Sequence, residues 1–196
     1  LGLYFMCQSY RIPARPFWNH WQVSTTFFGT MFSLGGILLA IIAVPTLAFI
    51  GQDFTALLQL SSGLVMLGLL AEGLGLLAHA KYLNTESGEG GAAHYIQQTT
   101  FGKSYIARNV LLAVGVVITA VISLALAETT LGLVLAALVA PTILIALLMG
   151  RALFYVLVIP TTMPGAFFWK NKGFEQHARD IGLAEMPQVG VVPDLH

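Results

Sequence analysis

Residues 131–150 read LGLVLAALVAPTILIALLMG, a stretch in which no side chain carries a charge. A helix of about 20 mostly apolar residues is long enough to cross the hydrocarbon core of a bilayer. Lipid offers no hydrogen bonds to the backbone, so an open chain crosses it as a helix, which satisfies its own N–H and C=O groups. This stretch therefore predicts a transmembrane helix and an all-α fold.

The composition of the whole chain agrees with a location in the membrane. Of its 196 residues, 57% are hydrophobic. Only 9% are Asp, Glu, Lys or Arg, against roughly 25% in soluble domains. A soluble domain of this size cannot hide so much apolar side chain. The nine basic and nine acidic residues cancel, so no overall field attracts nucleic acid, and we expect no nucleic-acid binding.

Long intervals with few or no charges predict four spans, which cover residues 24–50, 54–82, 105–127 and 131–159. Residues 1–10 lack the basic start of a signal peptide, and we expect them to be the end of a preceding transmembrane helix. The sequence thus predicts a polytopic transmembrane helix bundle. Its four complete spans lie within residues 11–159, and residues 160–196 form an interfacial and cytoplasmic tail.

Local patterns add detail to these spans. Pro45 and Pro141 should kink their helices, because each removes a backbone hydrogen bond. The polar, Gly-rich residues 84–100 predict a surface loop, and the tail predicts one short amphipathic helix around Phe174 and Ile181. Small residues should make the second span the most closely packed: Ser61, Ser62, Gly63, Gly68, Gly73 and Gly75.

The basic residues indicate an orientation in the membrane. With four spans, all nine fall on one side, whereas the opposite side carries only Asp53 and Glu128. By the positive-inside rule, the basic side is cytoplasmic. We expect Trp18, Trp21 and Trp169 at the same interface, where amphipathic rings collect.

Apart from Lys81 at the end of the second span, four Asp, Glu, His, Lys or Arg side chains lie within the spans: Glu72, His79, Arg108 and Arg151. A charged side chain at this depth costs roughly 2.5–3.5 kcal/mol on insertion scales, so each is a candidate functional residue. Glu72 and His79 are seven residues apart and share a helix face, as do Arg151 and Tyr155 four residues later. Three helices therefore bring polar groups to a similar depth, which is typical of a head-group site in which Glu72 and His79 transfer protons.

Structural roles for the same residues are the alternatives. Arg108 and Arg151 could snorkel to lipid phosphates or pair with Glu72. His79 could be a plain interfacial residue at the end of its helix. A carboxylate in mid-membrane must be protonated or paired, so Glu72 could serve either proton transfer or a structural pair.

The cysteine and histidine content limits the cofactors. Cys7 is the only cysteine, which excludes an internal disulfide and an iron–sulfur cluster with several cysteine ligands. A b-type haem needs two histidines at membrane depth, and only His79 qualifies, so we expect no haem or metal on this chain. Solvated side chains are expected for the histidines of loops and tail: His20, His94, His177 and His196.

Three stretches resemble a known family of membrane anchors. They are residues 9–36 (SYRIPARPFWNHWQVSTTFFGTMFSLGG), 104–115 (SYIARNVLLAVG) and 147–165 (LLMGRALFYVLVIPTTMPG). They resemble, in order, the fifth, seventh and last helices of the membrane-anchor subunits of dimethyl sulfoxide reductase-type complexes. Those anchors have eight helices and are related to the anchors of polysulfide and nitrite reductases. The chain is similar to the second half of such a subunit.

The resemblance implies a function within a complex of the bacterial cytoplasmic (inner) membrane. Members of the family carry no haem and exchange electrons between membrane quinone and an iron–sulfur subunit, which serves a molybdopterin catalytic subunit. Some oxidise sulfite. Arg108, Arg151 and Tyr155 would then lie near the quinone. The family's own quinone-site His and Glu belong to the first half and have no counterpart here.

Two other functions remain as alternatives to a quinone-reactive anchor. A small transporter or channel would use Glu72 and Arg151 to line a substrate pathway. A purely structural anchor would have no site.

Overall fold

The computed structural model describes residues 1–86, 89–158 and 180. Within these residues all regular structure is helical, which confirms the predicted all-α fold. The elements are α1 Gly2–Tyr10, α2 Gln22–Phe49, α3 Thr55–Leu83, α4 Glu89–Gln98, α5 Gly102–Val121, the π-helical turn η1 Ile122–Leu126 and α6 Thr130–Val156. The amphipathic helix predicted around Phe174 and Ile181 lies outside the described residues.

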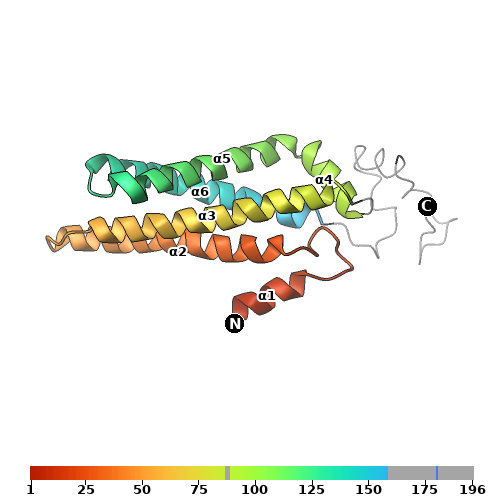
Figure 1. Cartoon of the computed structure of the whole chain (residues 1–196), viewed down its shortest axis with the longest axis horizontal. Helices are drawn as coiled ribbons and strands as arrows, with labels where there is room; N and C mark the ends of the chain where they lie inside the picture. Colours follow the sequence, from red (N-terminus) through yellow and green to blue (C-terminus); the bar gives the residue numbers. More distant parts are fainter. Residues whose placement is uncertain (87–88, 159–179, 181–196) are drawn as a thin grey trace.

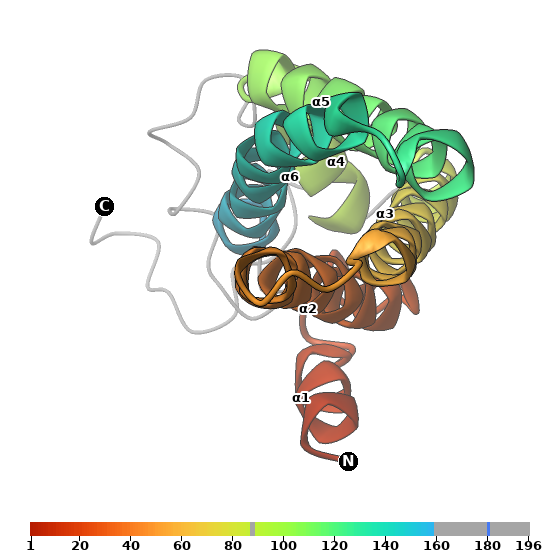
Figure 2. The same cartoon turned by 90° about the vertical axis from the view of Figure 1, so that its left-hand side faces the viewer.

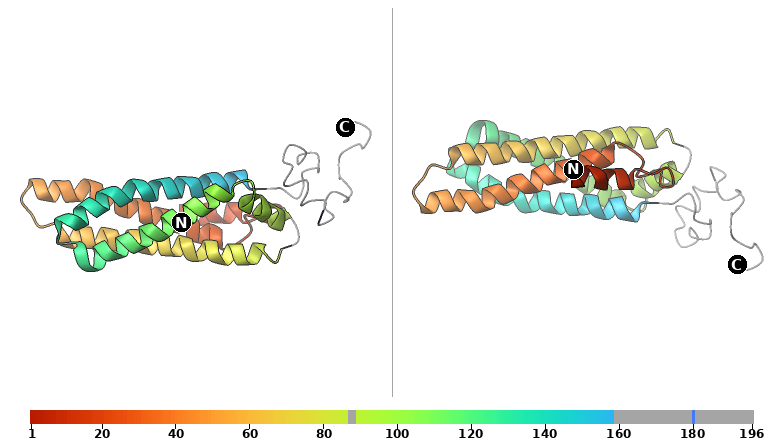
Figure 3. Two further views of the ribbon diagram at one scale, coloured as in Figure 1. Left: turned by 90° about the horizontal axis from the view of Figure 1, so that it is seen from above. Right: turned by 90° about the horizontal axis from the view of Figure 1, so that it is seen from below.

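Four helices are long and apolar enough to cross a membrane: α2, α3, α5 continued by η1, and α6. They correspond to the four predicted spans, with ends that differ by a few residues. The helices run side by side along the long axis of the molecule (Figure 1). Views from above and below show the same common direction, with α4 at the end where α3 finishes (Figure 3).

Seen end-on, the four long helices form a ring in chain order, α2, α3, α5 and α6, and α1 lies outside it against α2 (Figure 2). The packing around this ring is uneven. The α2–α3 contact is much the most extensive, whereas α2 and α6 touch only sparsely. The ring therefore has one tight seam and one open seam.

Glycine makes the α2–α3 seam tight. A Cβ atom on Gly29 would lie 2.6 Å from the Gly68 carbonyl oxygen, and one on Gly68 would lie 2.5 Å from that of Gly29. Small residues let helix backbones approach this closely. Ten residues of α3 are buried, more than in any other helix described, so the prediction that this span is the most closely packed is confirmed. Gly73 is the exception, because a Cβ there meets nothing within 4 Å.

The prediction that residues 84–100 form a surface loop is wrong for the part that forms α4. Residues 89–98 form a helix, and Ala92, Ala93 and Ile96 on one of its faces are buried. Their spacing is helical, but the Gly and Gln residues around them made the stretch look like a loop. Small side chains allow α4 to pack closely against the ends of α3 and α5.

The helices containing proline are not interrupted. α2 continues through Pro45 and α6 through Pro141, and the kinks expected at these residues stay predictions. The π-helical turn at the end of α5 was not predicted. There, Ser123 Oγ donates to the Gln59 carbonyl oxygen of α3 at 3.0 Å, so the wider turn is fastened to a neighbouring helix.

The two ends of the bundle differ in charge. Asp53 and Glu128 lie in the short connections at one end, whereas α4 and its flanking basic residues lie at the other, here called the basic end. Trp21 is exposed at the basic end, as expected of an interfacial ring. Trp18, in the loop before α2, is buried within the protein, and its Nε1 donates to the Phe154 carbonyl oxygen at 2.8 Å. Its depth in the membrane stays a prediction, and Trp169 lies outside the described residues.

Candidate functional site

Polar side chains gather between α2 and α3 in the half of the bundle nearer the basic end. Glu72 of α3 is only 1% exposed. Its carboxyl oxygen Oε2 accepts a hydrogen bond from Thr30 Oγ1 of α2 at 3.4 Å. Thr30 follows Gln22 and Thr26 at four-residue intervals, so the three share one face of α2. The Gln22 side-chain amide donates to Thr26 Oγ1 within this stripe.

Arg151 reaches the same hydroxyl group from α6. Its Nη2 donates to Thr30 Oγ1 at 3.4 Å, and its guanidinium lies over the Phe27 ring at 3.8 Å from the centroid. Its other terminal nitrogen, Nη1, is buried and has no hydrogen-bond partner among the described residues. Thr30 thus connects Arg151 to Glu72, in place of the direct ion pair considered from the sequence.

Arg108 of α5 is buried, with 3% of its surface exposed, so it does not snorkel to lipid phosphates. Its Nε and Nη2 donate to Asn109 Oδ1 at 3.0 and 2.7 Å, and its guanidinium lies 5.1 Å from the Tyr105 ring centroid. Gly150 of α6 faces this group: a Cβ there would be 3.5 Å from both Arg108 Cδ and Glu72 Oε1.

His79 lies two turns along α3 from Glu72, toward the basic end, and is 5% exposed. Its ring packs against Phe17 and stacks on His20, each with 5.0 Å between centroids. His20 stacks in turn on Tyr82 at 5.2 Å. The Nε2 atom of His79 is buried and has no partner among the described residues.

His20 and His94 correct the expectation that loop histidines are solvated. His20 is half-buried, and burial, with Arg11 nearby, lowers its pKa. His94 of α4 is 3% exposed. Its Nδ1 lies 3.1 Å from Gln97 Oε1, and its Nε2 lies 2.8 Å from Gln98 Nε2. Burial lowers the pKa of His94, against a smaller opposite effect of the Gln97 hydrogen bond.

Five helices and the loop before α2 line a small cavity of about 20 Å³ among these side chains. Its polar lining comes from α2, α3, α4 and α5, and Gly150 contributes backbone from α6. We call these side chains the polar cluster: Gln22, Thr26, Glu72, His79, Gln97 and Arg108. The cluster combines an acid, a base and a cation that are shielded from lipid.

Tyr155 lies apart from the polar cluster. Its hydroxyl is 2.9 Å from that of Tyr10, and half of its surface is exposed. Tyr10 also packs against Trp18, Phe27 and Phe154, with ring centroids 5.0–5.5 Å apart. These aromatic rings attach α1 and the following loop to α6. The structure therefore brings Glu72, His79 and Arg108 together and places Arg151 beside them, but leaves Tyr155 in an aromatic cluster.

Residues that sequence reasoning missed complete the site. Thr30 could have been found, because Gln22, Thr26 and Thr30 recur at helical spacing in an otherwise apolar span. Gln97 could not, because its part in the cavity depends on α4 folding back over the bundle. His20 could not have been predicted either, because nothing in the nearby sequence indicates that its ring stacks on that of His79.

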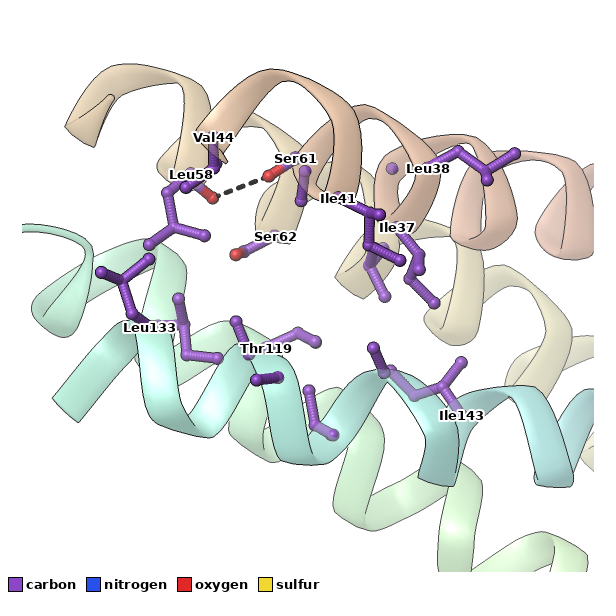
Figure 4. Close-up of a pocket in the computed structure, with 18 of the residues that line it drawn as sticks. Ile37, Leu38, Ile41, Val44, Leu58, Ser61, Ser62, Thr119, Leu133 and Ile143 are labelled. Carbon is purple, nitrogen blue, oxygen red and sulfur yellow. Dashed lines mark hydrogen bonds between the residues drawn. The ribbon is translucent and has the colours of Figure 1, made fainter. Parts of the chain in front are cut away.

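A much larger cavity of about 730 Å³ lies in the other half of the bundle, toward Asp53 and Glu128. Figure 4 shows its lining, which is almost entirely aliphatic and comes from both sides of the sparse α2–α6 contact. Leu34 of the lining is one turn from Thr30 along α2, and Leu144 is two turns from Arg151 along α6. The apolar cavity thus ends one turn of α2 short of Thr30 and two turns of α6 short of Arg151.

The chain is a multi-pass membrane protein of the α-helical class, with a buried polar cluster at one depth and an apolar cavity at another. Comparison with protein-family models, with curated proteins and with solved structures found no match for it.

Proposed function

We propose that this chain is a quinone-interacting membrane anchor subunit of a molybdopterin iron–sulfur oxidoreductase complex, of the dimethyl sulfoxide reductase or sulfite dehydrogenase type. It binds the head group of a quinone or quinol beside Arg151 and Thr30. It also holds an iron–sulfur subunit, which exchanges electrons with the quinone and serves the molybdopterin subunit.

The observation that carries this proposal is the buried Arg151 Nη1, which lacks a partner among the described residues, with an apolar cavity two turns away along α6. A buried polar atom without a partner costs about 1–3 kcal/mol, so a ligand that accepts its hydrogen bond is favoured. A quinone combines carbonyl oxygens with a long apolar tail. Cavities of roughly 300–1,000 Å³ with an apolar lining and a few directed polar groups are typical of small-molecule sites. The cavity of about 730 Å³, whose lining reaches Leu34 one turn from Thr30 and Leu144 two turns from Arg151, agrees with this description in size and apolar character.

Quinone chemistry also moves protons, and the polar cluster supports that part of the proposal. Glu72 hydrogen-bonds to the same hydroxyl as Arg151, so a carboxyl group lies one side chain away from the proposed head group. His79 lies on the same face of α3, closer to the basic end. Glu72 would exchange protons with the head group, and His79 with the aqueous side.

Electron transfer to or from the quinone requires a partner subunit. Cys7 is the only cysteine and is buried in α1, so this chain cannot supply the several thiolates of an iron–sulfur cluster. The choice of an iron–sulfur and a molybdopterin subunit rests on the resemblance of residues 9–36, 104–115 and 147–165 to anchor subunits.

Purification of the chain from its native membrane with its bound partners tests the proposal. We expect molybdenum, iron and quinone to co-elute with it, and quinone or quinol turnover per molybdenum to be measurable. Glu72→Gln keeps the shape and most hydrogen bonds but cannot transfer a proton. It should slow turnover across the pH range without loss of molybdenum and iron from the complex.

Three outcomes would contradict the proposal. Absence of molybdenum and iron from the intact preparation would remove the redox partners. Solute flux through liposomes that contain only this chain would favour a transporter. A complex whose quinone turnover is unchanged by substitution of Glu72 and of Arg151 would favour a structural anchor.

A further inference from the structure

The small cavity beside Glu72 has polar side chains of α2, α3, α4 and α5 in its lining. A cavity must offer about 10–15 Å³ and two to four polar partners to hold one water molecule. This one has about 20 Å³. We propose that it binds one ordered water that joins the Glu72 carboxyl to His79 Nε2, and that Glu72 exchanges its proton with the basic end through this water. The inference concerns this chain alone and does not rest on the redox role proposed above.

The partners of the water follow from the hydrogen bonds that the cluster leaves unmade. His79 Nε2 is buried without a partner in the part of the chain that the structure describes, and its residue lines the cavity. The one hydrogen bond of the Glu72 carboxyl to the described residues is through Oε2 to Thr30. Its other oxygen, Oε1, points toward Gly150, which also lines the cavity. A water between these two side chains would supply a partner to both.

The neighbouring charges disfavour a metal ion, and the small size of the cavity disfavours a polyatomic anion. Arg108 lines the cavity, and Arg151 lies behind Thr30, so two cations already face one carboxyl group. A metal cation would be repelled by both guanidinium groups, and the cavity has room for one water-sized ligand only. The described residues contain no group of three or more His, Cys, Asp or Glu side chains that could hold a metal ion.

The proton path leads toward the basic end because His79 lies two turns nearer that end than Glu72. The His79 ring stacks on His20, which is half-buried and lies against the exposed Tyr82. The water takes one proton from the Glu72 carboxyl as it gives one to His79 Nε2, and the imidazolium then releases a proton toward the basic end. Uptake of another proton by His79, followed by the reverse transfer through the water, restores both groups. No bond other than O–H and N–H is made or broken.

Substitution of Gly150 by alanine offers a way to remove the water with little other change in the site. A methyl group there would make ordinary van der Waals contacts of 3.5 Å with Glu72 Oε1 and Arg108 Cδ, so alanine fits but takes space from the cavity. Gly73 is a matched control: it neighbours Glu72 on the same helix, and a methyl group there meets nothing within 4 Å.

The experiment is hydrogen–deuterium exchange of the Glu72 carboxyl in the purified membrane protein, followed by infrared spectroscopy of its C=O stretch. The band of Glu72 is the one that disappears in Glu72→Gln. We expect Gly150→Ala and His79→Gln to slow its exchange at least tenfold, and Gly73→Ala to leave it unchanged. A structure that resolves ordered waters should show one water in the parent protein and none in Gly150→Ala.

Several results would overturn the inference. These are equal exchange rates in the parent and in Gly150→Ala, absence of a carboxyl band assigned to Glu72, and a cavity without water density in such a structure. If His79→Gln does not fold, the exchange rates of the parent and of Gly150→Ala, together with the water density, still test the inference. Loss of quinone activity in the whole complex would leave the inference standing, because none of these measurements uses quinone.

Discussion

At the scale of single residues, one hydroxyl group organises the site. Thr30 Oγ1 donates to Glu72 and accepts from Arg151, each at 3.4 Å. A hydroxyl is suited to this position because it has one proton to donate and two lone pairs to accept with. It keeps a carboxyl and a guanidinium at a fixed separation without a direct ion pair.

Replacement of Thr30 by valine removes this connection while keeping the shape of the side chain. A hydrogen bond of this kind contributes about 1 kcal/mol, so we expect about a fivefold loss of quinone turnover per complex. Thr46→Val is the control, because the Thr46 hydroxyl bonds only within its own helix, to the Ile42 carbonyl oxygen, and is exposed. Equal turnover in both variants would show that the connection has no functional role.

Arg151 can be tested by separating its charge from its shape. Arg151→Leu should lower quinone turnover per complex more than it lowers the yield of complex. Arg151→Lys keeps a charge but loses the planar group that contacts Thr30 and Phe27, so we expect partial activity. Full activity of the lysine variant, with poor assembly of the leucine variant, would instead indicate a cation that only contacts lipid.

At the scale of helices, the close approach of α2 to α3 positions Glu72 next to the polar face of α2. Gly68→Ala should push the two helices apart, because the new methyl group would lie 2.5 Å from Ser33 Oγ and from the Gly29 carbonyl oxygen. Overpacking of this kind typically costs about 1–3 kcal/mol. Thermal unfolding in detergent should therefore show a lower midpoint. Gly73→Ala should not lower it, and an equal effect of both would contradict the close packing.

The short helix α4 should loosen in acid because of His94. Burial lowers the pKa of this histidine in the folded state, below its ordinary value of about 6.5. Below that ordinary value the unfolded segment binds a proton that the folded one does not. The stability of α4 is therefore full above about pH 6.5 and falls as the pH drops further.

Backbone amide exchange measures this effect. After correction for intrinsic rates, the amides of α4 should exchange faster at about pH 5.5 than at about pH 8, on either side of the ordinary histidine pKa. The His94→Gln variant should lack the difference. A pH dependence of equal size in that variant would assign the effect to another group.

At the scale of the whole molecule, the bundle has a basic end and an acidic end, and its orientation in the membrane stays a prediction. Cysteine introduced at Thr85 should react with impermeant reagents from the cytoplasmic side, and cysteine at Glu128 from the opposite side. Both positions are exposed, and the native Cys7 is buried and contributes only background. Labelling of both positions from the same side would contradict the four-span topology.

The sequence alone determined the class of protein and the course of the chain through the membrane. Residues such as 131–150 are so apolar that lipid is the only solvent in which they are stable, and lipid leaves the backbone no choice but a helix. The apolar solvent also made Glu72, His79 and Arg108 candidates, because an ionisable side chain within a span costs free energy whichever way it faces. These conclusions depend on one residue and its near neighbours, so no tertiary structure was needed.

The tertiary structure decided which of these groups meet and what lies between them. Thr30, Gln97 and His20 are ordinary polar residues in the sequence, and they join the site because α2 packs on α3 through Gly29 and Gly68 and because α4 folds over the basic end. Such contacts join residues far apart along the chain. They depend on how closely two backbones approach, which a pattern within a single helix does not contain.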